Sequence, residues 1–269
     1  MNNFLKTAIT ASIKAGKEIL KIYNTDFEVE YKTDESPLTI ADKNANEIIM
    51  SFLKNTGIPV LSEEGRSISY QERKNWSSLW IVDPLDGTKE FVKRNDEFTV
   101  NIALIEKGVP ILGVVYVPVT DELYFGDLDS GSFKLLNASS VYSSSDNWID
   151  NAVKLPIKPE GNKPFTVVAS RSHLNKDTGD FIDELKKKYN DVQIISRGSS
   201  LKICMIAEGK ADVYPRFAPT SEWDTAAGHA VVKAMGGEVL QSENRNEELK
   251  YNKKEILNPW FIVYGNRKP

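Results

Sequence analysis

Acidic residues occur in three short segments where a strand or a helix is predicted to begin or end. They are Glu63 and Glu64 after an apolar Pro-Val-Leu, Asp83 and Asp86 in IVDPLDGT, and Asp224 in EWDTAAG. Taken singly, solvated loop charges, turn chemistry and a helix N-terminus explain them. Turn chemistry alone does not explain Asp83, because this residue follows an apolar run that is predicted to be buried. No Lys or Arg lies in residues 83–88 to balance its charge. A buried carboxylate needs compensation, which a bound divalent cation would supply.

The scarcity of sulfur and imidazole groups limits which metal could bind. The chain has one cysteine, Cys204, and two histidines, His173 and His229. An internal disulfide, a zinc site with several thiolates and a three-histidine site are therefore excluded. The remaining ligands are mainly oxygen atoms, which favour Mg²⁺, Ca²⁺ or Mn²⁺. Cys204 and His229 are predicted to be packing residues.

Composition and charge place the chain among globular proteins. Its 269 residues are 41% hydrophobic and 27% charged, and 34 Lys and Arg against 38 Asp and Glu give a formal net charge of −4. Binding of a nucleic-acid polymer would need a basic surplus, so it is not expected. No apolar run reaches the roughly 20 residues of a membrane span, and Lys6, Lys14 and Lys17 interrupt any signal peptide. We expect a cytoplasmic protein, with peripheral membrane association and oligomeric state left open.

The first half of the chain is predicted to form two helices followed by antiparallel strands. Apolar residues at helical spacing predict a helix over 4–23. Thr39 is the predicted N-cap of a second helix, with Asp42 three residues later in a capping box and Gly57 after its end. Strands are predicted at 79–82, 99–105, 111–117 and 122–125, of which the second and third form a hairpin.

The second half shows a different alternation of elements. Ser and Asn cluster between Asn137 and Asn151, which predicts a loop or a domain boundary. Beyond it, helices are predicted at 179–189, 200–209 and 223–235, and strands at 166–170, 192–196, 211–217, 238–240 and 260–265. We therefore divide the chain into residues 1–140 and residues 141–269.

The acidic motifs together resemble those of the inositol-monophosphatase superfamily of Mg²⁺-dependent, lithium-sensitive phosphatases. Glu63–Glu64, then DPLDGTKEF (Asp83–Phe91), then WDTAAGHAVV (Trp223–Val232) occur in the expected order, and the resemblance covers nearly the whole chain. It implies a mixed α+β or α/β protein with the layered αβαβα fold of these sugar phosphatases. The N-terminal half would carry an antiparallel sheet and most metal ligands, and the C-terminal half would carry Asp224 and the substrate pocket.

The resemblance also assigns roles to individual residues. Two or three Mg²⁺ ions are implied, with Mn²⁺ as an alternative. One ion would be held by Glu63, Asp83 and the carbonyl of Leu85, and the second by Asp83, Asp86 and Asp224. Asp42 would support a weaker third ion and, with Thr88, would orient and activate the attacking water, although capping alone also explains Asp42. The backbone amides of Gly87 and Thr88 would receive the phosphate.

Further segments point to a subgroup of the superfamily. DGTKEF, SRSH (Ser170–His173) and ADVYPR (Ala211–Arg216) resemble the 3′(2′),5′-bisphosphate nucleotidases of the CysQ type. These remove the 3′-phosphate of adenosine 3′,5′-bisphosphate, a by-product of sulfur assimilation, to give AMP, and some also hydrolyse phosphoadenylylsulfate. The substrate-binding residues that this implies are Gly87, Thr88, Lys89, His173, Ser199, Lys202 and Arg216.

Alternatives remain at this point. Lys202 on a helix is often a solvated charge, Arg216 a surface ion-pair partner, and His173 a helix cap. The second hypothesis for an enzyme is an inositol- or sugar-phosphate phosphatase with the same fold. A non-catalytic nucleotide or metal sensor and a structural protein with surface acids are the readings from other classes.

Overall fold

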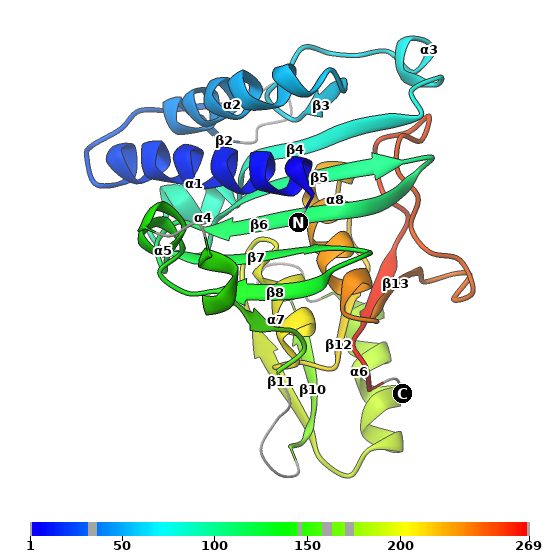
Figure 1. Cartoon of the computed structure of the whole chain (residues 1–269). Coiled ribbons are helices and arrows are strands. Elements are labelled where there is room, and N and C mark those ends of the chain that lie inside the picture. Colours follow the sequence, from blue (N-terminus) through cyan, green and yellow to red (C-terminus); the bar gives the residue numbers. More distant parts are fainter. Residues whose placement is uncertain (1, 32–36, 145–146, 158–162, 170–174, 268–269) are drawn as a thin grey trace.

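The chain folds into five alternating layers of helices and strands (Figure 1). The computed structural model describes residues 2–31, 37–144, 147–157, 163–169 and 175–267. Two helices cover a seven-stranded sheet, two more lie between this sheet and a five-stranded one, and a last helix covers the far face of the second sheet. The αβαβα layering is therefore confirmed.

The first sheet has the strand order β3-β4-β5-β6-β7-β8-β9. β3 is parallel to β4, and all other neighbours are antiparallel. Side chains alternate between the faces, so that Trp80 and Val82 pack under the outer helices while Leu79 and Ile81 face the inner ones. The strands are β3 (Val60–Ser62), β4 (Ser78–Asp86), β5 (Thr99–Glu106), β6 (Val109–Val117), β7 (Glu122–Asp127), β8 (Gly131–Leu135) and β9 (Val153–Lys154).

The outer layer consists of α1 (Asn3–Tyr23) and α2 (Ile40–Leu53), which pack on each other and on this sheet. Their bounds agree closely with the prediction. Thr39 caps α2 in a capping box with Asp42, as expected. Gly57 ends the following 3₁₀ turn η1 (Lys54–Thr56) in the left-handed conformation, with φ 71°.

The second sheet has the order β11-β10-β12-β14-β13, with parallel pairing around β10 and antiparallel pairing around β14. α6 (Lys176–Lys188) covers its outer face, and α7 (Leu201–Glu208) and α8 (Glu222–Ala234) lie between the sheets. Each of these elements was predicted within a few residues. The strands are β10 (Phe165–Ala169), β11 (Val192–Ser196), β12 (Val213–Arg216), β13 (Glu238–Gln241) and β14 (Phe261–Tyr264).

Close packing fixes α8 against the first sheet. A Cβ atom at Gly113 of β6 would lie 2.3 Å from the carbonyl oxygen of Ala227 and 2.7 Å from the Cβ atom of Ala230. Only glycine fits there, because real Cβ atoms do not approach a backbone so closely. This contact fixes the position of α8, whose first turn carries Asp224.

The Ser- and Asn-rich stretch at 137–151 is not the loop that its composition predicts. It contains α5 (Ala138–Ser144) and a 3₁₀ turn, η2 (Trp148–Asn151), with residues 145 and 146 outside the described part. Trp148 is buried in the first core, and Val141 and Tyr142 pack against that core. These apolar anchors outweigh the polar composition. Because β9 then pairs with β8, the change of sheet falls after Lys154 rather than at the predicted boundary of 140.

The remaining elements are short. They are β1 (Val29–Tyr31), β2 (Pro37–Thr39), α3 (Tyr70–Arg73) and α4 (Thr88–Val92).

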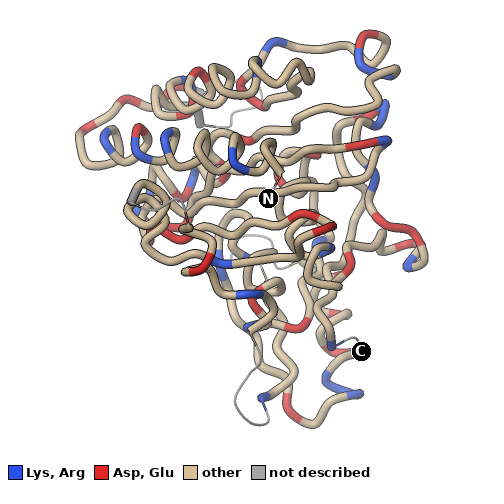
Figure 2. Tube along the Cα trace, viewed as in Figure 1, with Lys and Arg blue, Asp and Glu red and all other residues tan. Residues whose placement is uncertain are grey.

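The charged residues are mixed in sign along the chain. Figure 2 shows Lys and Arg interspersed with Asp and Glu along both halves of the chain. Within the described residues, no helix is long and apolar enough to cross a membrane.

Candidate metal and phosphate site

An irregularity in β4 brings two acids to one face of the sheet. The strand was predicted to stop at Asp83, but it continues to Asp86. Asp83 pairs with Asn101 and Asp86 pairs with Thr99, so that β4 has one more residue than β5 across this interval. Residues 83 and 86 would point to opposite faces of a regular strand, and the extra residue removes that difference. Consistent with this shift, Leu85 packs into the core under α1 and α2.

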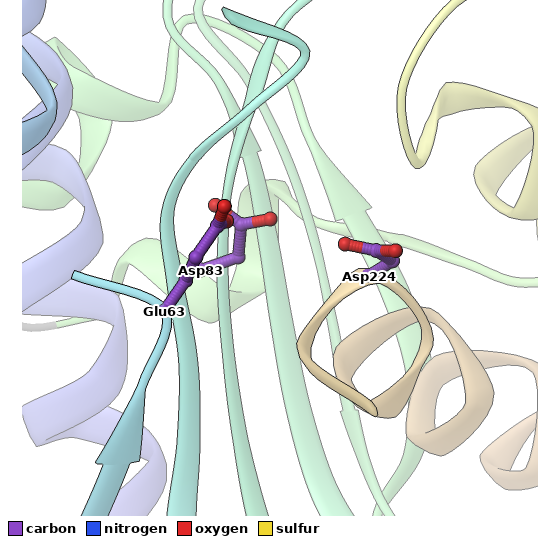
Figure 3. Close-up of side chains that lie close together, drawn as sticks. All are labelled: Glu63, Asp83 and Asp224. Atoms are coloured by element: carbon purple, nitrogen blue, oxygen red, sulfur yellow. The ribbon is translucent and has the colours of Figure 1, made fainter. Parts of the chain in front are cut away.

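Three carboxylates converge where the two halves of the chain meet. Glu63, Asp83 and Asp224 each place one oxygen within 4.8 Å of the others. Figure 3 shows Glu63, directly after the end of β3, beside Asp83 of β4, with Asp224 facing them from the start of α8. The backbone N–H of Glu63 donates to the Val82 carbonyl, which extends the β3–β4 pairing to the site. Residues far apart in the sequence thus form one acidic group.

The electrostatics of this group favour a bound cation. Burial raises the pKa of Asp83 well above its ordinary value, and Glu63, Asp86 and Asp224 raise it further. Burial, followed by the charge of Asp86, raises the pKa of Asp224 to about 8. Near neutral pH these acids must either bind protons or share a cation. Their oxygen donors suit a hard divalent ion such as Mg²⁺, so these residues fit the predicted metal.

Asp42 uses its two oxygens differently. Oδ2 accepts from the backbone N–H of Thr39 at 2.8 Å and from its hydroxyl at 2.7 Å, which is the capping role. Oδ1 lies 3.2 Å from the Thr88 hydroxyl, which also lies 3.2 Å from the Leu85 carbonyl oxygen. Burial raises the pKa of Asp42. Capping and a contact with the predicted catalytic threonine therefore coexist.

Gly87 makes the turn that leads from β4 into α4. Its φ of 94° lies in the region that favours glycine, and an added Cβ atom would lie 3.0 Å from the Glu97 carbonyl oxygen. Gly87 is also the N-cap of α4. The turn therefore places the backbone amides of Gly87 and Thr88 beside the end of β4, where the sequence predicted a phosphate site.

Asp86 lies beside the three-acid group and is held by the second half of the chain. Its Oδ2 accepts from the hydroxyls of Ser199 and Ser200 at 2.5 and 2.6 Å and from the backbone N–H of Ser200 at 2.6 Å. Thr99 and Asn101 complete these surroundings from β5. Asp86 is therefore a predicted metal ligand that is surrounded by hydrogen-bond donors.

A cavity of 380 Å³ adjoins Asp86 and Asp224. Five cationic residues are among those that line it: Lys89, Lys93, Arg197, Lys202 and Arg216. The predicted residues Gly87, Lys89, Ser199, Lys202 and Arg216 are thus brought together at one cavity, whereas His173 lies outside the described residues. Lys93 and Arg197 were missed, although Lys93 lies one helical turn after Lys89 and Arg197 directly precedes Gly198-Ser199-Ser200.

Two of these cations are held by backbone carbonyls. Lys202 is 7% exposed, and its ammonium group donates to the Ser199 carbonyl at 2.7 Å and to the Arg197 carbonyl at 3.3 Å. Burial lowers the pKa of Lys202 to about 8. Arg216 donates to the Pro219 carbonyl at 3.0 Å. Lys202 is therefore not the solvated charge that its helical context also allowed.

Cys204 and His229 are packing residues, as predicted. Cys204 is 2% exposed within the second core, and burial raises its thiol pKa well above the ordinary value. His229 is fully buried on α8, where its Nδ1 lies 3.0 Å from the Tyr251 hydroxyl. Neither residue lines the 380 Å³ cavity.

Comparison with known proteins shows similarity along nearly the full length. The sequence profile of the inositol monophosphatase family matches residues 1–261. The chain is 42% identical over 255 residues to the 3′(2′),5′-bisphosphate nucleotidase CysQ of Salmonella typhimurium, which covers 93% of this chain and 94% of that relative.

Two solved structures extend the similarity to the fold. The crystal structure of CysQ from Bacteroides thetaiotaomicron matches with a TM-score of 0.89 and 51% identity, covering 98% of this chain and 97% of that one. The extragenic suppressor protein suhB of Bartonella henselae matches with a TM-score of 0.74 and 25% identity, covering 98% and 95%. Both halves of the chain, and therefore every segment of the site, fall within these matches.

Proposed function

The chain belongs to the inositol monophosphatase family, and from this we propose that it is a Mg²⁺-dependent phosphomonoesterase that removes the 3′-phosphate of adenosine 3′,5′-bisphosphate to give AMP and phosphate. The convergence of Glu63, Asp83 and Asp224 beside a cavity lined by cations carries the proposal. The nucleotidase relatives support this substrate. We propose phosphoadenylylsulfate as a second substrate. We also propose that the enzyme is cytoplasmic and removes a by-product of sulfur assimilation.

In this proposal, the acids hold two Mg²⁺ ions. Glu63, Asp83 and the Leu85 carbonyl form one ligand set, and Asp83, Asp86 and Asp224 form the other. Bound divalent cations lower the pKa of water to near neutrality and neutralise charge on phosphate. The two ligand sets share Asp83, which is the most deeply buried of the three clustered acids and whose carboxylate gains most from a cation.

Asp42 and Thr88 orient the attacking water. The Thr88 hydroxyl is held between Asp42 Oδ1 and the Leu85 carbonyl oxygen. A water that donates to the Thr88 oxygen is therefore held near the phosphate. When this water gives its proton to Thr88, the Thr88 hydroxyl passes its own proton to Asp42 Oδ1. Asp42 would also support a third, weaker ion. The amides of Gly87 and Thr88 bind phosphate oxygens, since two backbone N–H groups at a turn form an anion site.

The cationic cavity binds the second, non-reacting phosphate. Lys202 and Arg216 supply the charge for this group, and Lys89 on α4 adds to it. The Ser199 hydroxyl already donates to Asp86, so toward the substrate it can only accept a bond. That chemistry suits a ribose hydroxyl and not a phosphate oxygen. His173 is proposed to stack on the adenine.

The proposal is tested by phosphate release from three substrates. We expect adenosine 3′,5′-bisphosphate to be preferred over inositol 1-phosphate and fructose 1,6-bisphosphate. Release should stop when Mg²⁺ is omitted, return when it is restored, and be inhibited by lithium. A clear preference for either polyol phosphate would support the sugar-phosphatase alternative instead. Activity that survives Asp83→Asn in a clean preparation would contradict the assigned site.

A further inference from the structure

One oxygen of Asp86 is saturated by hydrogen bonds. Oδ2 accepts three bonds of 2.5 to 2.6 Å, from the hydroxyls of Ser199 and Ser200 and from the Ser200 backbone N–H. A carboxylate oxygen has about two lone-pair directions, so three short donors leave no room for a cation. Within the described part of the chain, no hydrogen bond reaches Oδ1 of the same carboxylate. The two oxygens of Asp86 are therefore not equivalent.

A relay of buried side chains sets the direction of one of these bonds. The Thr99 hydroxyl lies 3.0 Å from Asn101 Oδ1, and Asn101 Nδ2 donates to the Ser200 hydroxyl at 2.9 Å. Because Asn101 accepts through its oxygen, its amide nitrogen must face Ser200. Because the Ser200 oxygen then accepts from Asn101, its single proton is available to Asp86. These three residues are at most 3% exposed, so water does not compete for their bonds.

The relay joins the two halves of the chain at the site. Thr99 and Asn101 lie on β5 and are the register partners of Asp86 and Asp83. Ser200 lies at the start of α7, and its hydroxyl is also 3.0 Å from the carbonyl oxygen of Asp224. One serine therefore contacts both Asp86 and the backbone of the acid that faces it.

The backbone before α7 is held in an uncommon conformation that favours this contact. Ser199 has a φ of 48°, which costs free energy in a residue other than glycine. The buried ammonium group of Lys202 donates to the Ser199 carbonyl at 2.7 Å. Lys202 thus holds the turn, and the turn directs the donors at residues 199 and 200 toward Asp86.

We propose that Thr99, Asn101 and Ser200 are positioning residues for Asp86. They hold Oδ2 so that Oδ1 is the oxygen presented to a divalent cation, and they set the distance between Asp86 and Asp224. The inference rests on the proposed function in one respect, namely that Asp86 is a metal ligand. It extends that function by assigning a role to Thr99 and Asn101 on β5 and to Ser200 at the start of α7.

The test measures Mn²⁺ affinity by calorimetry and by electron paramagnetic resonance, on full-length protein without substrate. We expect Asn101→Ala and Ser200→Ala to weaken Mn²⁺ binding roughly tenfold, the lower end of the loss found when residues behind metal ligands are removed. The Mg²⁺ concentration for half-maximal activity should rise in parallel. Thr99→Val should weaken Mn²⁺ binding to a smaller extent. Thr99→Ser keeps the hydroxyl group and should bind Mn²⁺ with wild-type affinity.

A matched control separates positioning from a general loss of stability. Thr178 is also buried, and its hydroxyl bonds Asn175 at 2.7 Å at the start of α6, away from the site. We expect Thr178→Val to lower the melting temperature without changing Mn²⁺ affinity. Wild-type affinity in both Asn101→Ala and Ser200→Ala would overturn the inference. If those two variants do not fold, equal affinity of Thr99→Val and Thr99→Ser would overturn it.

Failure of the proposed function would be visible separately. It would appear as a wild-type protein that releases no phosphate from adenosine 3′,5′-bisphosphate. The Mn²⁺ measurements do not depend on turnover, so they would still decide whether these residues position Asp86. Conversely, an active wild type whose variants keep full Mn²⁺ affinity would leave the proposed function intact and refute the positioning role.

Discussion

Replacing Asp83 by Asn should have opposite effects on the metal-free and the metal-loaded protein. Without metal, Asp83 lies among Glu63, Asp86 and Asp224, and burial together with these charges raises its pKa. The amide oxygen of Asn can still accept the bond that Asp83 Oδ1 accepts from the Leu85 backbone N–H at 3.1 Å. The substitution therefore removes a repelled buried charge while keeping the local hydrogen bond.

The size of the effect follows from the geometry. Two unit charges separated by the 4.8 Å limit that the three acids share repel by about 3 kcal/mol at an effective dielectric constant of about 20. Protonation of one acid relieves part of this repulsion, so we expect Asp83→Asn to stabilise the metal-free protein by about 2 kcal/mol. For a chain of this size, that raises the melting temperature by roughly 4 to 8 °C.

The pH dependence has a defined sign. A raised carboxyl pKa means that folded protein keeps a proton which the unfolded chain releases above about pH 4. Metal-free wild type should therefore lose stability as pH rises from about 4 toward the folded pKa of Asp83. The variant lacks this contribution, so its advantage should grow between pH 5 and pH 8.

Thermal unfolding in EDTA and in Mg²⁺ measures both effects. We expect Asp83→Asn to melt above wild type in EDTA, to gain nothing from Mg²⁺ and to release no phosphate. Asp129→Asn, at an exposed position between β7 and β8, is the matched control and should behave like wild type. A variant that melts below wild type in EDTA, or that keeps the stabilisation by Mg²⁺, would refute the reasoning.

Three further predictions concern the pocket, the packing of α8 and its buried histidine. Because burial lowers the pKa of Lys202 to about 8, the KM for the bisphosphate should rise above pH 8. Lys202→Met should raise KM at pH 7 and remove that rise, and an unchanged KM would exclude Lys202 from phosphate binding. Gly113→Ala should cost about 3 kcal/mol in urea unfolding, because its Cβ would lie 2.3 Å from the Ala227 carbonyl oxygen; a neutral result would show that α8 can move. Burial lowers the pKa of His229 to about 3, so stability should fall by about 1.4 kcal/mol per pH unit as pH drops below about 6.5. Urea midpoints for His229→Asn should show a shallower fall, and an identical slope would contradict a buried neutral imidazole.

The elements that depend on residues close together in the sequence were predicted correctly. The capping box at Thr39 and Asp42 follows from residue types three positions apart, and it is present. The hairpin of β5 and β6 follows from two apolar runs around Glu106-Lys107-Gly108. The layered arrangement of these elements came from the resemblance and not from periodicity.

Longer-range features could not be predicted in this way. The extra residue in β4 depends on pairing with β5, which no local pattern around Asp83 records. Similarly, the two serines that hold Asp86 are more than 100 residues away in the sequence. One signal was available: Thr99 and Asn101 are polar residues at alternate positions in a strand that is apolar from Ile102 to Ile105, which indicates a polar partner on one face.

Composition misled where a few apolar residues dominate the packing. The stretch at 137–151 is rich in Ser and Asn, yet Trp148 is buried and Val141 packs against the first core. Two or three anchors are enough to order such a segment, because each buries a large apolar area. A count of residue types gives every position equal weight and therefore misses them.

Anomalous diffraction from a crystal soaked in Mn²⁺ tests the central claim most directly. We predict ions bound between Glu63, Asp83 and Asp224, with Asp86 contributing its Oδ1 oxygen and keeping Oδ2 on the two serines. Diffraction that shows no anomalous peak among these acids, at Mn²⁺ concentrations that support phosphate release, would contradict the account.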